Sequence, residues 1–138
     1  MDRLAGQVFA ALLRVGIGFQ HNFILEVRGR KSGRVFSTPV NLLIHDGKTY
    51  LCASRGETQW VRNARVAGRV TLVKGSRRAE YPVRELPVAD RPEPLKEFLD
   101  RFATSVQRYY PVKKGAPVSA FAECAGTMPV FELTRDGI

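Results

Sequence analysis

Short apolar runs separated by turn residues predict a chain rich in β-strands. The first strand is expected over residues 23–28 and the second over residues 34–44. Pro39 lies inside the second run and cannot donate a ladder hydrogen bond, so this strand should lie at a sheet edge or contain a bulge. Asp46-Gly47 is a hairpin signal, and it predicts a returning strand over residues 48–53.

The remaining turn and helix signals extend this pattern. Gly75-Ser76 joins two further strands over residues 69–74 and 77–85, and a last strand is expected over residues 129–134. Helices are expected over residues 2–15 and 93–109, where apolar residues recur at three- and four-residue spacing. A third helix is expected over residues 59–67, between a Thr58 cap and a terminating Gly68, and one helical turn within residues 118–123.

These elements indicate a mainly β (α+β) fold of about six short, mostly antiparallel strands with an N-terminal helix and inserted helices. Closing such strands into a small β-barrel, or nearly closing them into a strongly curved sheet, manages the exposed edges that they would otherwise present. At 138 residues the chain is expected to be one domain, 1–138. The N-terminal helix falls within residues 1–18, and the barrel and later helices within residues 20–138.

Composition narrows the choice of partners. The formal charge of +9 and the pI of about 10.2 favour an anionic partner, such as nucleic acid, a phosphorylated cofactor or an acidic membrane surface. Cys52 and Cys124 lie far apart and lack CxxC spacing, so neither a metal site nor a disulfide framework is expected, in keeping with a reducing cytosol. No apolar run approaches the ~18 residues of a membrane-spanning helix, and no signal peptide is expected.

The most specific local signal lies between the first two expected strands. Residues 28–34 combine four cations, two glycines and a hydroxyl with no acid: Arg28-Gly29-Arg30-Lys31-Ser32-Gly33-Arg34. Glycines let successive backbone N–H groups form an anion nest, and the side chains add forked and point-charge donors. The segment therefore predicts a phosphate-binding turn, although a basic hairpin turn without a ligand has the same composition. It is not a Walker loop, because no helix follows directly.

A second segment combines small residues with the start of a helix. Ala53-Ser54-Arg55-Gly56 would let a planar ring or a phosphate approach closely, and the helix N-terminus after it favours anions. Trp60 and Asn63 are one turn apart and share a face. Trp60 is either a core anchor or a ligand wall, and Asn63 either satisfies buried backbone or reaches a ligand.

No convincing set of catalytic side chains accompanies these segments. His21 and His45 are isolated, and His45 is expected to be exposed beside a hairpin turn. An enzyme is still compatible with this sequence, because a bound cofactor can supply the difficult chemistry while the protein binds and orients it.

Taken in order, these motifs resemble one family. They are Gly29-Arg30-Lys31-Ser32-Gly33, Thr38-Pro39, Asp46-Gly47, Ala53-Ser54-Arg55-Gly56 and Trp60-x-x-Asn63. The set is similar to the deazaflavin-dependent nitroreductase/quinone reductase family, best over residues 20–75. The resemblance implies the split β-barrel of flavin-reductase-like proteins and binding of the deazaflavin coenzyme F-420.

The resemblance also implies roles for individual residues. Cations and the hydroxyl of the basic turn would hold the phosphate and acidic tail, other residues would line the ring, and two tyrosines are candidates for the substrate side. Glu57 departs from the nitroimidazole-activating branch and adds a negative charge near the anion site. The implied set is Arg30, Lys31, Ser32, Gly33 and Arg34 at the tail; Thr38, Pro39 and Val40 at the ring; Ala53, Ser54, Arg55 and Gly56 at the ring edge; Trp60 and Asn63 behind that wall; and Tyr109 and Tyr110 toward the substrate.

The activity that follows is hydride transfer between reduced F-420 and an electron-poor quinone, enone or nitro compound. Two alternatives stay open: the same fold with FMN, or a non-catalytic protein that binds an anion or nucleic acid. Nucleic acid is not expected, because no aromatic residues interleave with the basic turn as a stacking platform. A homodimer is expected by family analogy. A cytoplasmic location is expected from the cysteine usage, with peripheral contact to the inner membrane face left open.

Overall fold

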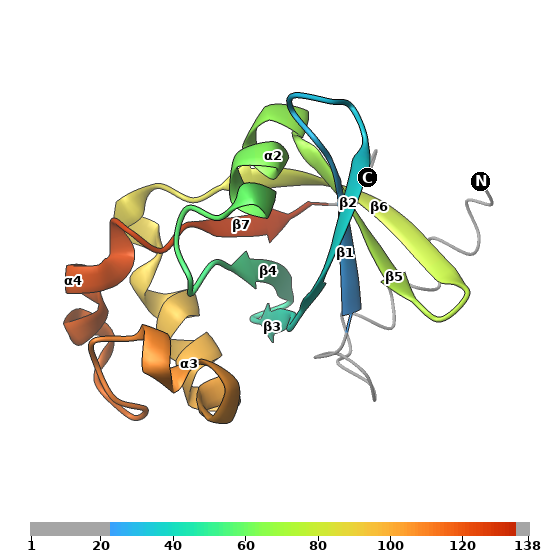
Figure 1. Ribbon diagram of the computed structural model, residues 1–138. Coiled ribbons are helices and arrows are strands. Elements are labelled where there is room, and N and C mark those ends of the chain that lie inside the picture. Colours follow the sequence, from blue (N-terminus) through green and yellow to red (C-terminus); the bar gives the residue numbers. More distant parts are fainter. Residues whose placement is uncertain (1–22, 135–138) are drawn as a thin grey trace.

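The computed structural model describes residues 23–134, so the helix expected over residues 2–15 lies outside the described residues. Within that range seven antiparallel strands form one sheet in the order β2-β1-β5-β6-β7-β4-β3 (Figure 1). The strands are β1 (Phe23–Arg28), β2 (Val35–Val40), β3 (Leu43–His45), β4 (Lys48–Cys52), β5 (Arg69–Lys74), β6 (Arg77–Glu85) and β7 (Val130–Leu133). The helices are α2 (Gln59–Ala67), α3 (Pro92–Val106) and α4 (Ala122–Ala125), with 3-10 turns η1 (Val88–Asp90), η2 (Gln107–Tyr109) and η3 (Val118–Phe121).

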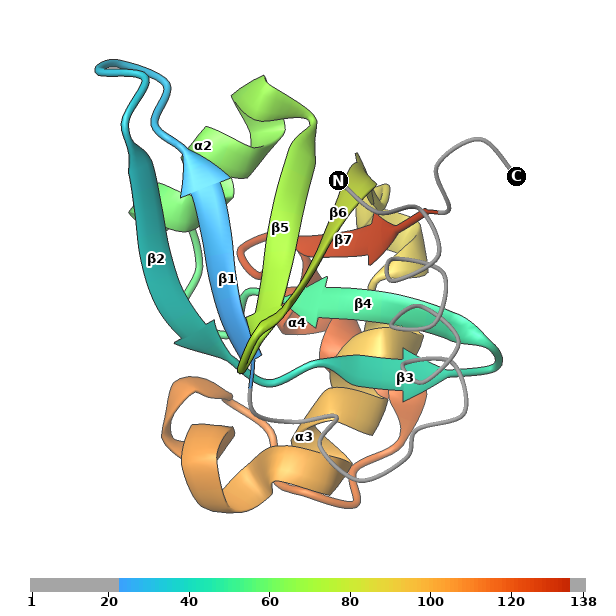
Figure 2. The same cartoon turned by 90° about the vertical axis from the view of Figure 1, so that its right-hand side faces the viewer.

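The sheet curls into a half-barrel. β2 and β3 stand at opposite ends of the strand order, yet only Asn41 and Leu42 separate them in the chain. A two-residue link cannot span a flat seven-stranded sheet, because neighbouring strands lie about 4.8 Å apart, so the two edges must approach each other. Figure 2 shows the result, with β3 and β4 running crosswise to β1 and β5. The predicted split-barrel type of fold is confirmed.

The prediction of a single strand over residues 34–44 is wrong, because this segment forms two strands, β2 and β3. Within the described residues, the pairing of β1 with β2 runs as far as Phe23 and Val40. The chain crosses instead to the opposite edge, where Leu43 pairs with Tyr50 of β4. Pro39 does lie in an edge strand, as expected. This division accounts for seven strands where about six were predicted.

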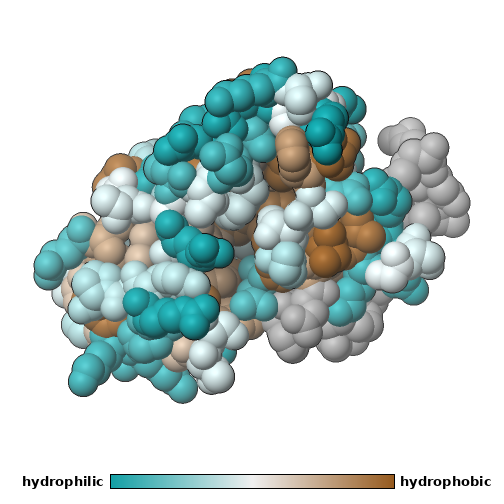
Figure 3. All heavy atoms as spheres, in the orientation of Figure 1, coloured by the Kyte–Doolittle hydropathy of each residue, from teal (hydrophilic) through white to brown (hydrophobic). Residues whose placement is uncertain are grey.

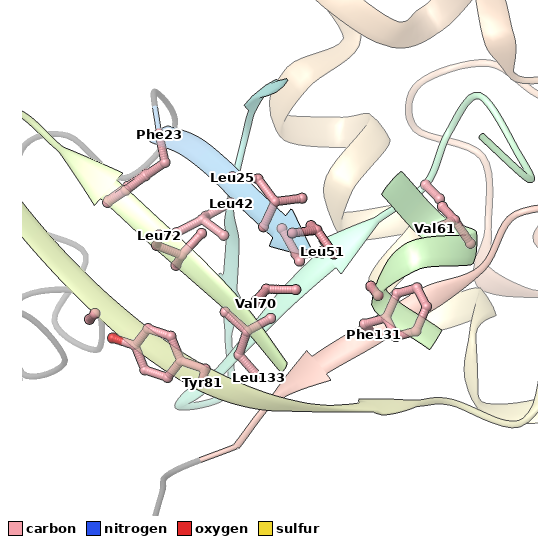
Figure 4. Packing of buried hydrophobic residues seen from close by; sticks show 14 residues of the cluster. Phe23, Leu25, Leu42, Leu51, Val61, Val70, Leu72, Tyr81, Phe131 and Leu133 are labelled. Atoms are coloured by element: carbon pink, nitrogen blue, oxygen red, sulfur yellow. The ribbon is translucent and has the colours of Figure 1, made fainter. Parts of the chain in front are cut away.

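Two clusters of buried side chains stabilise the fold. One fills the curl of the sheet and includes Leu25, Leu72 and Phe131, with Phe131 beside Val61 of α2 (Figure 4). The other lies between the β3–β4–β7 end of the sheet and α3, around Leu95 and Phe121. Among the described residues, no helix is both long and apolar enough to cross a membrane.

The two longer helices expected within the described residues are present. The bounds of α2 agree with the prediction, and those of α3 do not. α3 has non-helical dihedral angles at Phe102 (φ −119°, ψ 25°) and ends at Val106, so the stretch to Tyr109 continues as the 3-10 turn η2. α2 has the predicted bounds and ends at Gly68 in the left-handed conformation (φ 73°). Thr58 occupies the N-cap position, but its side chain makes no capping hydrogen bond, so the predicted capping role of its hydroxyl is wrong.

Candidate coenzyme site

A hollow lies between the β1–β2 hairpin, which overhangs α2 in Figure 1, and α2 itself. Its volume is about 730 Å³. A second hollow of about 150 Å³ adjoins it and shares Pro39, Arg55, Thr58 and Trp60 with it. Together they offer the space that small-molecule and cofactor sites commonly have.

The loop between β1 and β2 is a tight, hydrogen-bonded turn. The Gly29 amide donates to the Arg34 carbonyl (2.6 Å), and the Gly33 amide donates to the Gly29 carbonyl (3.0 Å). Gly33 has φ 77°, which favours glycine. A Cβ on Gly29 would lie 2.6 Å from the Phe36 ring, so that position requires glycine for space. The loop therefore presents its long side chains from a fixed backbone.

Asn63 joins this loop to α2. It is 4% exposed, and its Oδ1 accepts hydrogen bonds from the Arg30 backbone N–H (3.1 Å) and from Arg30 Nη1 (2.7 Å). Gln59 Oε1, one helical turn earlier, accepts a further bond from Arg30 Nη1 (3.0 Å). Both acceptors are neutral, so the guanidinium is oriented without losing its positive charge to an ion pair.

The lining of the two hollows is strongly cationic. It contains Arg30, Lys31, Arg34 and Arg55 and no Asp or Glu. Arg34 lies over the Phe36 ring at 5.7 Å, a cation–π contact that leaves its donors available. Figure 3 shows hydrophilic atoms gathered at the top of this face, over the β1–β2 loop and α2. Four cations without an acid make a site for an anion of several charges.

The negative charge of Glu57, expected near the anion site, is paired with a cation of its own. Its carboxylate receives two hydrogen bonds from Arg65, at 3.0 Å (Nη1) and 2.9 Å (Nη2), and these lower the pKa of Glu57. Arg65 also binds Glu85 at 2.8 Å. Glu57 lines neither hollow, so its charge lies outside the site and is compensated there.

The N-terminus of α2 adds a further attraction for anions. The first turn of α2 contains no acidic residue, so the positive end of the helix dipole is not compensated locally. Thr58 Oγ1 is buried and makes no hydrogen bond within residues 23–134, and Thr58 lines both hollows. Buried hydroxyls without a partner are costly, so this one is a candidate for a ligand contact.

The two tyrosines predicted for the substrate side have different surroundings. Tyr110 is buried, and its hydroxyl forms a 2.7 Å hydrogen bond with Ser54 Oγ. Burial raises the pKa of Tyr110, so its hydroxyl stays protonated. Tyr109 lines the hollow, with Arg55 over its ring at 5.7 Å and Arg108 Nη2 donating to its hydroxyl at 3.0 Å.

The structure brings most of the predicted site residues together. Every predicted cofactor residue except Gly33 lines one of the two hollows, and Gly33 instead shapes the turn. Of the two tyrosines, only Tyr109 lines a hollow. Sequence reasoning missed Phe36, two positions before Thr38 on the same strand, and Gln59, one helical turn before Asn63. Strand and helix periodicity could have found both.

Comparison with known proteins identifies the family. Residues 7–119 match the family described as F420H(2)-dependent quinone reductase. The chain belongs to this family. This match confirms the resemblance seen in the sequence motifs. It also confirms, at the level of the family, the expectation of an F-420-dependent oxidoreductase. No curated protein matches the chain.

Solved structures support the same fold at low sequence identity. An F420-H2 dependent reductase, FDR-A, is 19% identical with a TM-score of 0.55 over 83% of this chain and 95% of its own. A protein of unknown function from Agrobacterium tumefaciens gives a TM-score of 0.65 at 16% identity. The match covers 99% of this chain but only 56% of the length of the Agrobacterium protein. A protein described as a domain-swapped dimer gives a TM-score of 0.58 at 16% identity, covering 93% of this chain and 92% of its own.

Proposed function

We propose that this protein binds coenzyme F-420 between the β1–β2 hairpin and α2 and uses its reduced form to reduce an electron-poor organic molecule. Family membership supports the coenzyme. The observation that carries the placement is the lining of the two hollows, which holds four cations and no acid. When bound, the reduced deazaflavin supplies a hydride.

The residues present fit such a ligand. Arg30, Lys31, Ser32 and Arg34 lie on one tight loop and suit a phosphate followed by an acidic tail. The unpartnered Thr58 hydroxyl lies where the two hollows meet and would gain a hydrogen bond from a bound polar group.

A flat ring would lie in the smaller hollow and its mouth. Pro39, Val40 and the small residues Ala53 and Gly56 border this space, and Trp60 stands between the two hollows. Trp60 is held by its tilted contact with Phe131, with ring centroids 5.8 Å apart. A wall fixed in this way holds a ring in one orientation, and reactions gain most from such fixed proximity.

The acceptor would enter beside Tyr109. This side chain borders the smaller hollow, whereas the Tyr110 hydroxyl is already bound to Ser54 in the core. We assign Tyr109 to contact with the acceptor and Tyr110 to support of the Ser54 side chain. A quinone is the acceptor class that the family description favours.

The alternative cofactor is FMN, which also has a planar ring and a phosphate. Its single phosphate needs fewer partners than the four cations that line the hollows, so we favour the more anionic deazaflavin. Nucleic acid is the weaker candidate, because the family match favours a coenzyme and four cations line a hollow of small-molecule size.

The proposal extends to the setting in which the protein works. A homodimer is favoured by the domain-swapped dimer among the structural relatives. We place the protein in the cytoplasm, where a reduced coenzyme is available, with peripheral contact to the inner face of the membrane compatible with its net charge of +9.

The test is an anaerobic assay with reduced F-420 as the only electron donor. Reappearance of the oxidised deazaflavin absorbance would be followed with a quinone, an enone and a nitroaromatic in turn. We expect saturable turnover with at least the quinone, and its loss in a Lys31→Ala/Arg34→Ala double variant. Absence of turnover with every acceptor, in protein that binds F-420, would overturn the proposed acceptor classes. Absence of binding would overturn the site itself.

A further inference from the structure

Three ligand-type side chains meet outside the coenzyme site. His45 ends β3, Asp46 begins the turn to β4, and Glu93 lies in the first turn of α3. None of the three lines either hollow of the coenzyme site. His45 was expected to be exposed, but its side chain is only 20% exposed because α3 packs over β3.

The ligand atoms have the spacing of a metal site. His45 Nε2 lies 3.2 Å from Glu93 Oε1 and 3.6 Å from Asp46 Oδ2. All three candidate ligand atoms lie within 4.8 Å of one another. Ligands about 2.1 Å from a tetrahedral ion lie about 3.4 Å apart, and the two distances from His45 bracket that value. The exposed Asp46 and Glu93 side chains need only small adjustments to close around an ion.

The other nitrogen of the imidazole also faces a carboxylate. Glu97, one turn after Glu93 on α3, places Oε1 at 3.9 Å from His45 Nδ1. Metal-ligating histidines commonly direct the non-ligating N–H at a carboxylate, which fixes the tautomer and strengthens the ligand. A simple hydrogen bond between His45 and Glu93 would explain the position of Glu93 alone. It would not explain why the carboxylates of Asp46 and Glu97 also lie near the imidazole.

We propose that His45, Asp46 and Glu93 bind a first-row divalent cation of the zinc type, with Glu97 orienting the imidazole. One imidazole and two carboxylates suit zinc and the neighbouring transition metals better than magnesium, which prefers oxygen ligands alone. The bound ion would join the β3–β4 turn to the start of α3 and stabilise that contact. Water completes the coordination, since Glu93 also borders a separate cavity of about 460 Å³.

Sequence patterns contain no signal for this site, and no metal site was expected from them. His45 and Asp46 are neighbours where β3 meets the turn, and Glu93 follows His45 by 48 positions, at no recognised motif spacing. Only the packing of α3 over β3 brings them together.

The test is a titration of tag-free, chelator-treated protein with cobalt(II), followed by visible absorption, and with zinc in competition. We expect one saturable site and a thermal midpoint that rises when zinc is added. His45→Ala and Glu93→Gln should each weaken binding by at least about tenfold. Glu93→Gln is the safer variant for folding, because Glu93 is largely exposed.

Two control variants locate the ion. Glu123→Gln removes the same charge from an exposed position on α4, and His21→Ala removes the other histidine of the sequence. Both should bind cobalt as the wild type does. The proposal is overturned if binding does not saturate, or if His45→Ala and Glu93→Gln bind as tightly as Glu123→Gln.

Discussion

Replacing Asn63 with Asp tests whether the Arg30 guanidinium faces the anion. The substitution preserves the shape of the side chain and both hydrogen bonds that Oδ1 accepts, from the Arg30 amide (3.1 Å) and from Nη1 (2.7 Å). It adds one negative charge at hydrogen-bond distance from the guanidinium. The orientation of Arg30 is therefore kept while its net charge is cancelled.

The magnitude follows from Coulomb's law. A phosphate on the outer side of the Arg30 guanidinium lies about 7 Å from the new carboxylate, so the repulsion is ~2.4 kcal/mol at an effective dielectric of about 20 and ~0.6 kcal/mol at about 80. The Kd for F-420 should therefore rise by about 3- to 60-fold. The free energy of unfolding should change by less than about 1 kcal/mol, because the new carboxylate gains the guanidinium as an ionic partner while it loses water.

The assay is a fluorescence titration of F-420 at low and at high salt, beside urea unfolding of the same preparations. Ser76→Asp is the matched control, since it adds the same charge in the exposed β5–β6 turn. We expect the control to bind nearly as the wild type does. The reasoning is refuted if Asn63→Asp, with normal stability, binds F-420 no more weakly than Ser76→Asp.

Three further substitutions test other parts of the structure. Gly29→Ala should lower the free energy of unfolding in urea by about 1–3 kcal/mol, because a Cβ would lie 2.6 Å from the aromatic ring on β2; wild-type stability would contradict this. Tyr110→Phe should cost about 1 kcal/mol of stability, because Ser54 loses its partner, and leave turnover with a quinone unchanged; a large fall in kcat would instead assign it to the reaction. Glu57 has its pKa lowered by its hydrogen bonds from Arg65, so the stability that it contributes is present above its unfolded pKa and is lost as the pH falls through its lower folded pKa. Glu57→Gln should therefore flatten the fall of the thermal midpoint in acid, and an unaltered pH profile would refute that.

Local signals in the sequence were sufficient for most of the elements. The Asp46-Gly47 turn forms as predicted, with both residues at positive φ, and α2 has its predicted bounds. These features depend on neighbours in the chain. The break after Val40 could not be predicted, because it depends on pairing with β4 at the opposite end of the strand order.

Some features of the candidate site could likewise be predicted from the sequence, and others could not. The motifs located the basic loop and the small residues after β4, because each is a continuous segment. They did not reveal that Asn63 and Gln59 orient Arg30 across a separation of about thirty residues. Nor did they reveal that Glu57 pairs with Arg65, eight residues later in the chain. Charges are visible in a sequence, but their pairing is set by tertiary packing.

Binding of F-420 through its charged tail, in the hollow beneath the β1–β2 hairpin, is the step on which the proposed function depends. The most direct measurement is a set of fluorescence titrations of the purified protein with F-420, with the same deazaflavin lacking its phosphate and acidic tail, and with FMN. We expect micromolar or tighter binding of F-420 that weakens with salt, and much weaker binding of the other two compounds. Equal binding of F-420 and the tail-free deazaflavin, or preference for FMN, would contradict it.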